Sequence, residues 1–148
     1  MNKEWAELNR LMKRQDELYH RYAQNAGLTD TKFWVLYAMC ESGDVFCQNA
    51  FCESWRYSKQ TVSAAVASLE KDGLLYMEFV AGSKKQKNLQ LTEKGKGFCR
   101  EYIIPVMDAE CSSIMKLEKG ERRKFLDTMD KLLVLFGKEI STIPGIEK

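Results

Sequence analysis

Residues 47–91 constrain the fold of this chain more than any other segment. Their pattern predicts a short helix at about 48–55, a turn, a helix at 59–72, and two strands at 74–80 and 87–91. Gly82-Ser83 lies between the strands, so the strands are expected to form a hairpin with a basic tip. This order predicts a winged helix-turn-helix, whose second helix can enter the major groove of duplex DNA.

Helical patterns flank this segment on both sides. Apolar residues recur at three-or-four spacing in a first helix at 3–25, and a second helix at about 30–41 is apolar nearly all the way round. Two more helices are expected at 93–116, where Pro105 should produce a kink, and at 118–140. The predicted fold is therefore mainly α with a small β-hairpin wing.

The first helix and the last two carry more apolar surface than one small winged-helix core needs. We therefore expect a homodimer, with dimerisation helices at 1–27 and 93–148 and a DNA-binding winged helix-turn-helix lobe at 28–92. A chain of 148 residues, 45% hydrophobic and 30% charged, can bury such a core without disulfides, metal or cofactor.

Charge is unevenly distributed along the chain. The formal net charge is +2, but the stretch from Arg56 to Arg100 has nine basic and four acidic residues, a local charge of +5. This concentrates the positive field on the predicted DNA-binding lobe.

The N-terminus is polar and unlike a signal peptide, and the longest apolar run, Phe33 to Cys40, is too short to span a bilayer. We expect a cytoplasmic protein that makes no membrane contact. Its five cysteines, an odd number without framework spacing, are then expected to be reduced.

Helical geometry gives the predicted helix 59–72 a buried face and an outer face. The buried face holds Val62, Ala65, Val66 and Leu69. The outer face holds Gln60, Ala64, Ala67, Ser68 and Lys71, with Thr61 at its margin. Its centre is small, so the helix can approach DNA closely.

Specific roles follow from position on that helix. Gln60 and Thr61 in the first turn are placed to hydrogen-bond base edges, and glutamine can pair in a bidentate way with adenine. Ser58, Lys59 and Ser63 are placed to contact phosphates near the helix N-terminus. The alternative is an amphipathic helix whose outer face is merely solvated.

The hairpin favours DNA binding over that alternative. Lys84, Lys85 and Lys87 stand at its tip, where three like charges cost stability unless an anion is near. A cationic loop beside a reading helix can reach into a neighbouring minor groove.

Two motifs resemble the MarR family of bacterial transcriptional regulators. The family's reading helix has the form S-x-x-T-V-S-x-x-V-x-x-L-E-K-x-G-L, which is matched by Ser58, Thr61, Val62, Ser63, Val66, Leu69, Glu70, Lys71, Gly73 and Leu74. The signature L-T-x-K-G that follows the wing is matched by Leu91, Thr92, Lys94 and Gly95. The resemblance covers nearly the whole chain and implies a homodimer that binds a pseudo-palindromic operator.

The chain departs from the family pattern at two places. Ala64 stands where the family commonly has arginine, and Ser83-Lys84-Lys85 stands where the wing tip usually reads Asp-Arg-Arg. Lysine lacks the planar fork of arginine and is more strongly hydrated, so minor-groove insertion should be weaker. We therefore expect binding to depend mainly on phosphate charge, with a steep salt dependence.

The resemblance also implies a small aromatic or amphipathic effector, bound between the DNA lobe and the dimerisation helices. Tyr19, Tyr22, Trp34 and Tyr37 would line that cleft. The alternative, favoured because helical aromatic stripes usually pack, is that these rings belong to the core or the dimer interface.

Thiol sensing is a further hypothesis. Some relatives sense peroxides through a cysteine near the N-terminus, but no cysteine precedes Cys40 here. Cys47, near the start of the third helix, is the best candidate for a reactive thiol, although an inert role is the favoured interpretation. The other four, Cys40, Cys52, Cys99 and Cys111, are expected to be small core residues.

Neither a metal site nor an active site is predicted. The chain has a single histidine, His20, and no Cys-x-x-Cys motif. It also lacks a glycine-rich phosphate loop and an acidic cluster on an apolar face, so an enzyme is not expected. The main alternative to a ligand-responsive DNA-binding repressor is an interaction module that kept the winged helix without binding an operator.

Overall fold

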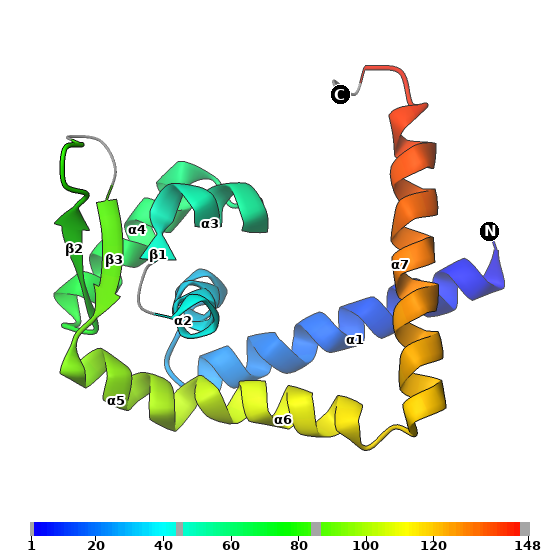
Figure 1. Cartoon of the computed structure of the whole chain (residues 1–148), viewed down its shortest axis with the longest axis horizontal. Helices are drawn as coiled ribbons and strands as arrows, with labels where there is room; N and C mark the ends of the chain where they lie inside the picture. The colour runs from blue at the N-terminus through cyan, green and yellow to red at the C-terminus, as the bar shows by residue number, and fades with distance from the viewer. Residues whose placement is uncertain (1, 44–45, 84–86, 146–148) are drawn as a thin grey trace. The chain divides into compact units, whose positions relative to one another are not determined.

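The computed structural model describes residues 2–43, 46–83 and 87–145. Its elements are α1 (Lys3–Asn25), α2 (Asp30–Ser42), β1 (Phe46–Cys47), α3 (Gln48–Trp55), α4 (Lys59–Lys71), β2 (Leu75–Phe79), β3 (Lys87–Leu91), α5 (Glu93–Tyr102), α6 (Ile104–Met115) and α7 (Lys119–Ser141) (Figure 1). The fold is mainly helical with a small sheet, which confirms the predicted fold class. None of the helices in the described ranges is long and apolar enough to cross a membrane.

The chain divides into two compact units, Met1–Val106 and Met107–Lys148. The first unit contains the complete winged helix-turn-helix together with α1 and α5. The predicted boundaries after residues 27 and 92 concern DNA binding and dimerisation, and they remain a prediction.

Helix α2 lies at the centre of the first unit. Figure 1 views it nearly end-on, with α3 and α4 on one side and α1 and α5 on the other. Its side chains Phe33, Val35 and Leu36 are fully buried. This burial on more than one side explains why the helix is apolar nearly all the way round.

The sheet has three antiparallel strands in the order β1-β3-β2. β2 and β3 form the predicted hairpin, in which Leu75 lies opposite Leu91 and Phe79 opposite Lys87. The sequence did not reveal β1, because a strand of two residues is too short to show an alternating pattern. It pairs with β3, with Phe46 opposite Leu89, and so joins the sheet directly to the start of α3.

Helix α4 buries the face that its periodicity predicted, and Val62, Ala65, Val66 and Leu69 all belong to the core. The helix ends in a Schellman motif one residue earlier than predicted. There the Gly73 amide donates to the Glu70 carbonyl at 2.9 Å, and the Leu74 amide donates to the Leu69 carbonyl at 3.0 Å. Gly73 has a φ of +73°, the left-handed conformation that this motif requires.

The predicted long helix at 93–116 is two helices, α5 and α6, separated at Ile103. Pro105 is the cause, because it has no N–H to donate and its ring would clash with the carbonyl four residues earlier. Proline is tolerated in the first turn of a helix, and here it is the second residue of α6. The expected kink is therefore a break.

The start of α5 holds the turn that ends α4. The Thr92 hydroxyl donates to the Gly73 carbonyl at 2.6 Å, the Thr92 amide donates to the Leu74 carbonyl at 3.1 Å, and Lys94 Nζ donates to the Asp72 carbonyl at 2.7 Å. We call these contacts between residues 72–74 and residues 92–95 the α4–α5 clamp. They give a physical reason for the threonine and lysine of the L-T-x-K-G motif.

Gly95 completes the clamp by its lack of a side chain. Its amide donates to Thr92 Oγ1 at 2.9 Å, which caps α5. A Cβ at this position would lie 1.8 Å from the Leu74 carbonyl oxygen, closer than any real contact. Only glycine lets α5 approach the end of α4 this closely.

Gly95→Ala is expected to lower the free energy of unfolding by at least about 1–3 kcal/mol, because backbone must move to admit the methyl group. Chemical denaturation measures this change. The matched control is Gly97→Ala in the same helix, where the new Cβ would meet only Arg100 Nη2, at 3.9 Å. That variant should be neutral or more stable by up to about 1 kcal/mol. Equal stability of the two variants would contradict the role assigned to Gly95.

Candidate DNA-binding surface

The first turn of α4 is fixed by two residues predicted to contact DNA. Ser58 is the N-cap, and its Oγ accepts from the Thr61 amide at 3.1 Å. The two hydroxyls also lie 2.7 Å apart and share a hydrogen bond. Because only one of them donates in that bond, one hydroxyl hydrogen remains to be donated outside the protein.

The outer face of α4 is open where the sequence predicted base contacts. Lys59, Gln60 and Ala64 are exposed, and Ser68 is half-buried. Within the part of the chain that the structure describes, the Gln60 carboxamide makes no side-chain hydrogen bond. Its donor and acceptor atoms are therefore available to a base edge.

Ser63, a predicted phosphate contact, already has a protein partner. The Gln48 carboxamide at the start of α3 donates to Ser63 Oγ at 2.9 Å. Sequence reasoning missed Gln48, because periodicity within one helix says nothing about which residue of the preceding helix lies beside it.

The turn between α3 and α4 has one unusual residue. Arg56 has a φ of +57°, the only positive φ found at a non-glycine position among the described residues. The next residue, Tyr57, stacks on Phe51 with ring planes 7° apart. Burial, with a smaller contribution from the nearby Asp30 carboxylate, raises the pKa of Tyr57. The turn that precedes the reading helix is thus held by aromatic packing.

The wing is described only up to its tip. Lys84 and Lys85, predicted to reach the minor groove, lie outside the described residues, and Lys87 begins β3. On the hairpin, the Tyr76 hydroxyl donates to Gln90 Oε1 at 2.8 Å, and Gln90 Nε2 donates to Glu78 at 2.7 Å. These side chains link β2 to β3 below the tip.

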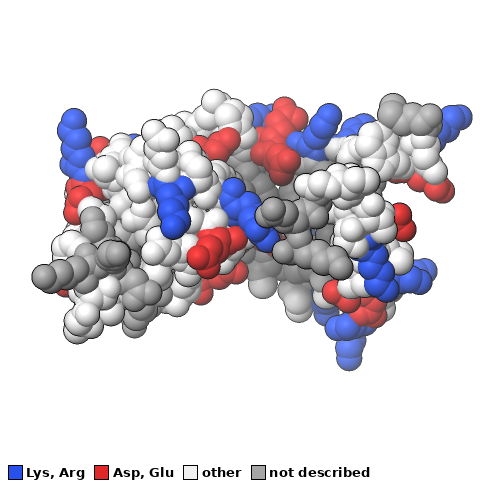
Figure 2. Space-filling model, turned by 90° about the horizontal axis from the view of Figure 1, so that it is seen from above, with Lys and Arg blue, Asp and Glu red and all other residues white. Residues whose placement is uncertain are grey.

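On the face shown in Figure 2, lysine and arginine side chains are interspersed with aspartate and glutamate side chains and with uncharged surface.

The four aromatic residues predicted to line an effector cleft lie together in one cluster. Tyr19 and Trp34 have ring centroids 4.8 Å apart, Trp34 and Tyr37 are 5.3 Å apart, and Tyr22 packs at 6.3 Å against Phe33. All four are half-buried. The contacts agree with the packing interpretation, and a ligand-binding role stays a prediction.

This cluster continues toward the reading helix. Trp34 contacts Trp55 at 4.9 Å, Trp55 stacks on Phe51 at 5.6 Å, and Phe51 stacks on Tyr57 at 5.9 Å. Aromatic contacts therefore run without interruption from α1 to the residue before the α4 N-cap.

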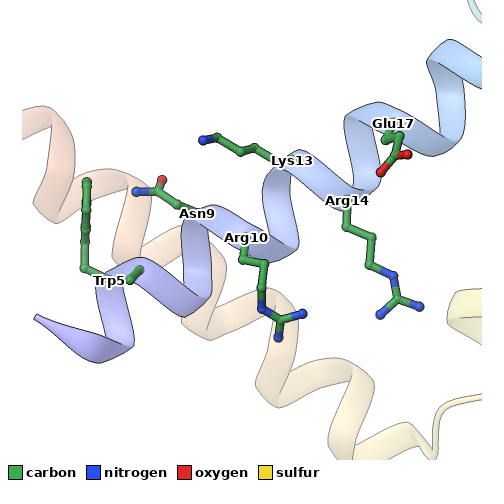
Figure 3. Close-up of a pocket in the computed structure, with 7 residues that line it drawn as sticks. Trp5, Asn9, Arg10, Lys13, Arg14 and Glu17 are labelled. Carbon is green, nitrogen blue, oxygen red and sulfur yellow. The ribbon is translucent and has the colours of Figure 1, made fainter.

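A hollow of about 600 Å³ lies on the N-terminal half of α1 (Figure 3). It is lined by Trp5, Ala6, Asn9, Arg10, Lys13, Arg14 and Glu17. All seven belong to one helix, so the hollow is a surface feature and not an enclosed cavity. None of its lining residues belongs to the aromatic cluster.

The cysteines differ from the predicted pattern. Cys52 and Cys99 are buried as expected, whereas Cys40 is half-buried and Cys111 is exposed, so the core assignment of Cys111 was wrong. Cys47, the best candidate for a reactive thiol, is half-buried at the N-cap of α3. The thiols of Cys40 in α2 and Cys99 in α5 instead influence each other's acidity.

The pKa values of the two thiols are shifted in opposite directions. The hydrogen bond from Cys99 lowers the pKa of Cys40, with burial acting in the opposite direction. The same bond, together with burial, raises the pKa of Cys99 well above its usual range. Cys40 therefore ionises first.

His20 makes a side-chain hydrogen bond to Asp30. Its Nδ1 lies 2.8 Å from Asp30 Oδ1, and the contact joins α1 to the first turn of α2. Among the described residues, no three histidine, cysteine or acidic side chains are grouped so as to hold a metal ion.

A family comparison agrees with the sequence motifs. The model of the MarR family matches residues 26–86, which run from the end of α1 through the helix-turn-helix into the wing. The match is to a family of transcription regulators and not of enzymes. No curated protein matches the chain.

Solved structures extend the similarity over nearly all of the chain. A MarR family regulator from Neisseria meningitidis is 22% identical, with a TM-score of 0.76 over 95% of this chain and 98% of that one. A Listeria monocytogenes protein complexed with 26mer DNA is 19% identical, with a TM-score of 0.73 over 100% and 99%. The S. aureus MepR–DNA complex is 20% identical, with a TM-score of 0.68 over 89% and 97%. The predicted resemblance to the MarR family is confirmed.

We expect iodoacetamide to alkylate Cys40 before Cys99 in the folded protein. Cys40 is half-buried whereas Cys99 is buried, and the pKa of Cys40 is lowered while that of Cys99 is raised, so Cys40 offers the more accessible and more acidic thiol. Labelling at several pH values, followed by peptide mass spectrometry, measures both rates. Faster labelling of Cys99 would contradict this assignment, and unfolding in denaturant should abolish the difference.

Proposed function

We propose that this chain, whose residues 26–86 match the MarR family, is a sequence-specific regulator of transcription that binds double-stranded DNA. It would act as a homodimeric repressor on a pseudo-palindromic operator, with α4 in the major groove and the wing beside it. The observation that carries the proposal is the outer face of α4. Its centre is small, its first turn is capped by Ser58, and Gln60 is open to solvent in that first turn, where it would read bases.

The proposed contacts are those that the sequence predicted. Gln60 and Thr61 would read bases. The remaining residues would allow close approach to the DNA and would contact phosphates and the minor groove: Ser58, Lys59, Ser63, Ala64, Ser68, Lys84, Lys85 and Lys87. Two of the three similar structures named above were solved with DNA, which supports the proposal for this fold.

Exposed apolar side chains support the homodimer. On α7, seven large apolar residues are at least about one-third exposed: Phe125, Leu126, Leu132, Leu133, Val134, Leu135 and Phe136. On α1, Trp5 and Leu18 are each more than half exposed. A soluble monomer seldom exposes this much apolar surface, and a second copy of the chain would cover it.

An effector would act through the aromatic cluster. A small aromatic or amphipathic molecule that displaced Tyr19 or Trp34 would disturb rings in contact with Trp55, and through Phe51 the turn at Tyr57. This gives a physical route from α1 to the start of the reading helix. We propose that such a ligand releases the protein from its operator.

Selection from a random duplex library should enrich a pseudo-palindromic sequence. Gln60→Ala should weaken binding to the selected duplex about tenfold or more, because a bidentate base contact is lost. The same substitution on an exposed residue of α1, Gln24→Ala, is the matched control and should bind as the unaltered protein does. Fluorescence anisotropy at fixed salt measures both affinities.

Failure to enrich any sequence would contradict operator binding. If the only binding seen were weak and sensitive to salt, the protein would be better explained as an interaction module that kept the winged helix. Ala64 and the lysine wing tip are the features that favour that second function.

Light scattering should give twice the chain mass of 17.1 kDa at micromolar concentration. Leu133→Glu is expected to shift the protein toward monomer, because a charge would be buried in the apolar interface. Lys131→Glu, two residues earlier on the opposite face of α7, serves as the control and should remain dimeric. A monomeric unaltered protein would contradict the proposed assembly.

A further inference from the structure

The hydrogen bond between Gln48 and Ser63 is the one side-chain hydrogen bond described between α3 and α4. Gln48 is the first residue of α3 and is half-buried, whereas Ser63 lies one turn into α4 and is exposed. The bond therefore lies at the surface, on the side of α4 that faces the start of α3.

The direction of this bond decides what Ser63 can do. A carboxamide nitrogen only donates, so Ser63 Oγ must be the acceptor in the 2.9 Å contact. A serine hydroxyl has a single hydrogen and two lone pairs, and the contact uses one lone pair. The hydroxyl hydrogen is left pointing away from Gln48.

A phosphate oxygen is the natural acceptor for that hydrogen. Phosphate oxygens accept and never donate, and a hydrogen bond to a charged acceptor is about twice as strong as a neutral one. Serine side chains are common phosphate contacts in protein–DNA complexes. Accepting from Gln48 also restricts the rotation of the hydroxyl, so little rotamer freedom is lost when the phosphate binds.

We propose that Gln48 is a positioning residue for DNA binding, which orients the Ser63 hydroxyl so that its hydrogen is donated to a DNA phosphate. This inference rests on the proposed function. It adds a residue of α3 to the DNA-binding set, although Gln48 itself need not touch DNA.

A purely structural bond, which only joins α3 to α4, makes a different prediction. Gln48→Glu separates the two roles, because a carboxylate only accepts and Ser63 would then donate to it. The link between the helices would survive in the variant. The hydrogen intended for the phosphate would be consumed.

Binding to the selected duplex should therefore fall about tenfold or more for Gln48→Glu and about threefold to tenfold for Gln48→Ala and for Ser63→Ala. The double variant Gln48→Ala/Ser63→Ala should bind no more weakly than Ser63→Ala alone, because both changes remove the same contact. Thermal midpoints of all variants should stay close to that of the unaltered protein.

The added charge of Gln48→Glu needs its own control. Asn49→Asp places the same charge on the next residue, which is exposed, and should weaken binding much less. In the Ser63→Ala background, Gln48→Glu should weaken binding to the selected duplex no more than Asn49→Asp does. The slope of affinity against salt should be unchanged by Gln48→Ala, since a neutral group releases no counterion.

Equal binding by Gln48→Glu and the unaltered protein would overturn the positioning role. The positioning role would also be overturned if the affinity losses of Gln48→Ala and Ser63→Ala multiplied in the double variant, because the two residues would then act independently. Absence of sequence-specific binding by the unaltered protein would instead show that the proposed function had failed, and the positioning role with it.

Discussion

The α4–α5 clamp is the interaction on which the rest of the winged helix-turn-helix depends. It satisfies the backbone carbonyls at the end of α4 with Thr92 and Lys94, and it brings α5 into contact with the Leu74 backbone at Gly95. Because β2 begins directly after this turn, the clamp fixes both the end of α4 and the base of the wing. The proposed reading of DNA by the outer face of α4 requires those two elements to keep a constant relation.

The other end of the reading helix is held by different chemistry. Aromatic packing fixes Tyr57 before the helix, hydroxyl hydrogen bonds fix its first turn, and Gln48 joins its exposed side to α3. The C-terminal end is thus tied by polar contacts to α5, whereas the N-terminal end is tied to rings that reach back to α1. An effector that acts on the aromatic cluster would therefore perturb the end of α4 that is proposed to approach bases and phosphates.

Local patterns predicted most of this fold, and contacts between elements account for what they missed. Periodicity gave all the helices within a residue or so, apart from the break near Pro105, and it gave the buried face of α4. Strand β1 was missed because it is defined only by its pairing with β3. The Gln48–Ser63 bond and the Cys40–Cys99 pair were missed because each joins residues from two helices, which spacing within one helix cannot place together.

The most direct test of the reading role of α4 is a hydroxyl-radical footprint of the protein on its selected duplex. Two α4 helices of a homodimer should protect two blocks of backbone whose centres are one helical turn, about 10–10.5 base pairs, apart. The blocks should be related by the two-fold symmetry of the sequence. One unsymmetrical block, or uniform protection along the duplex, would contradict recognition by a pair of reading helices.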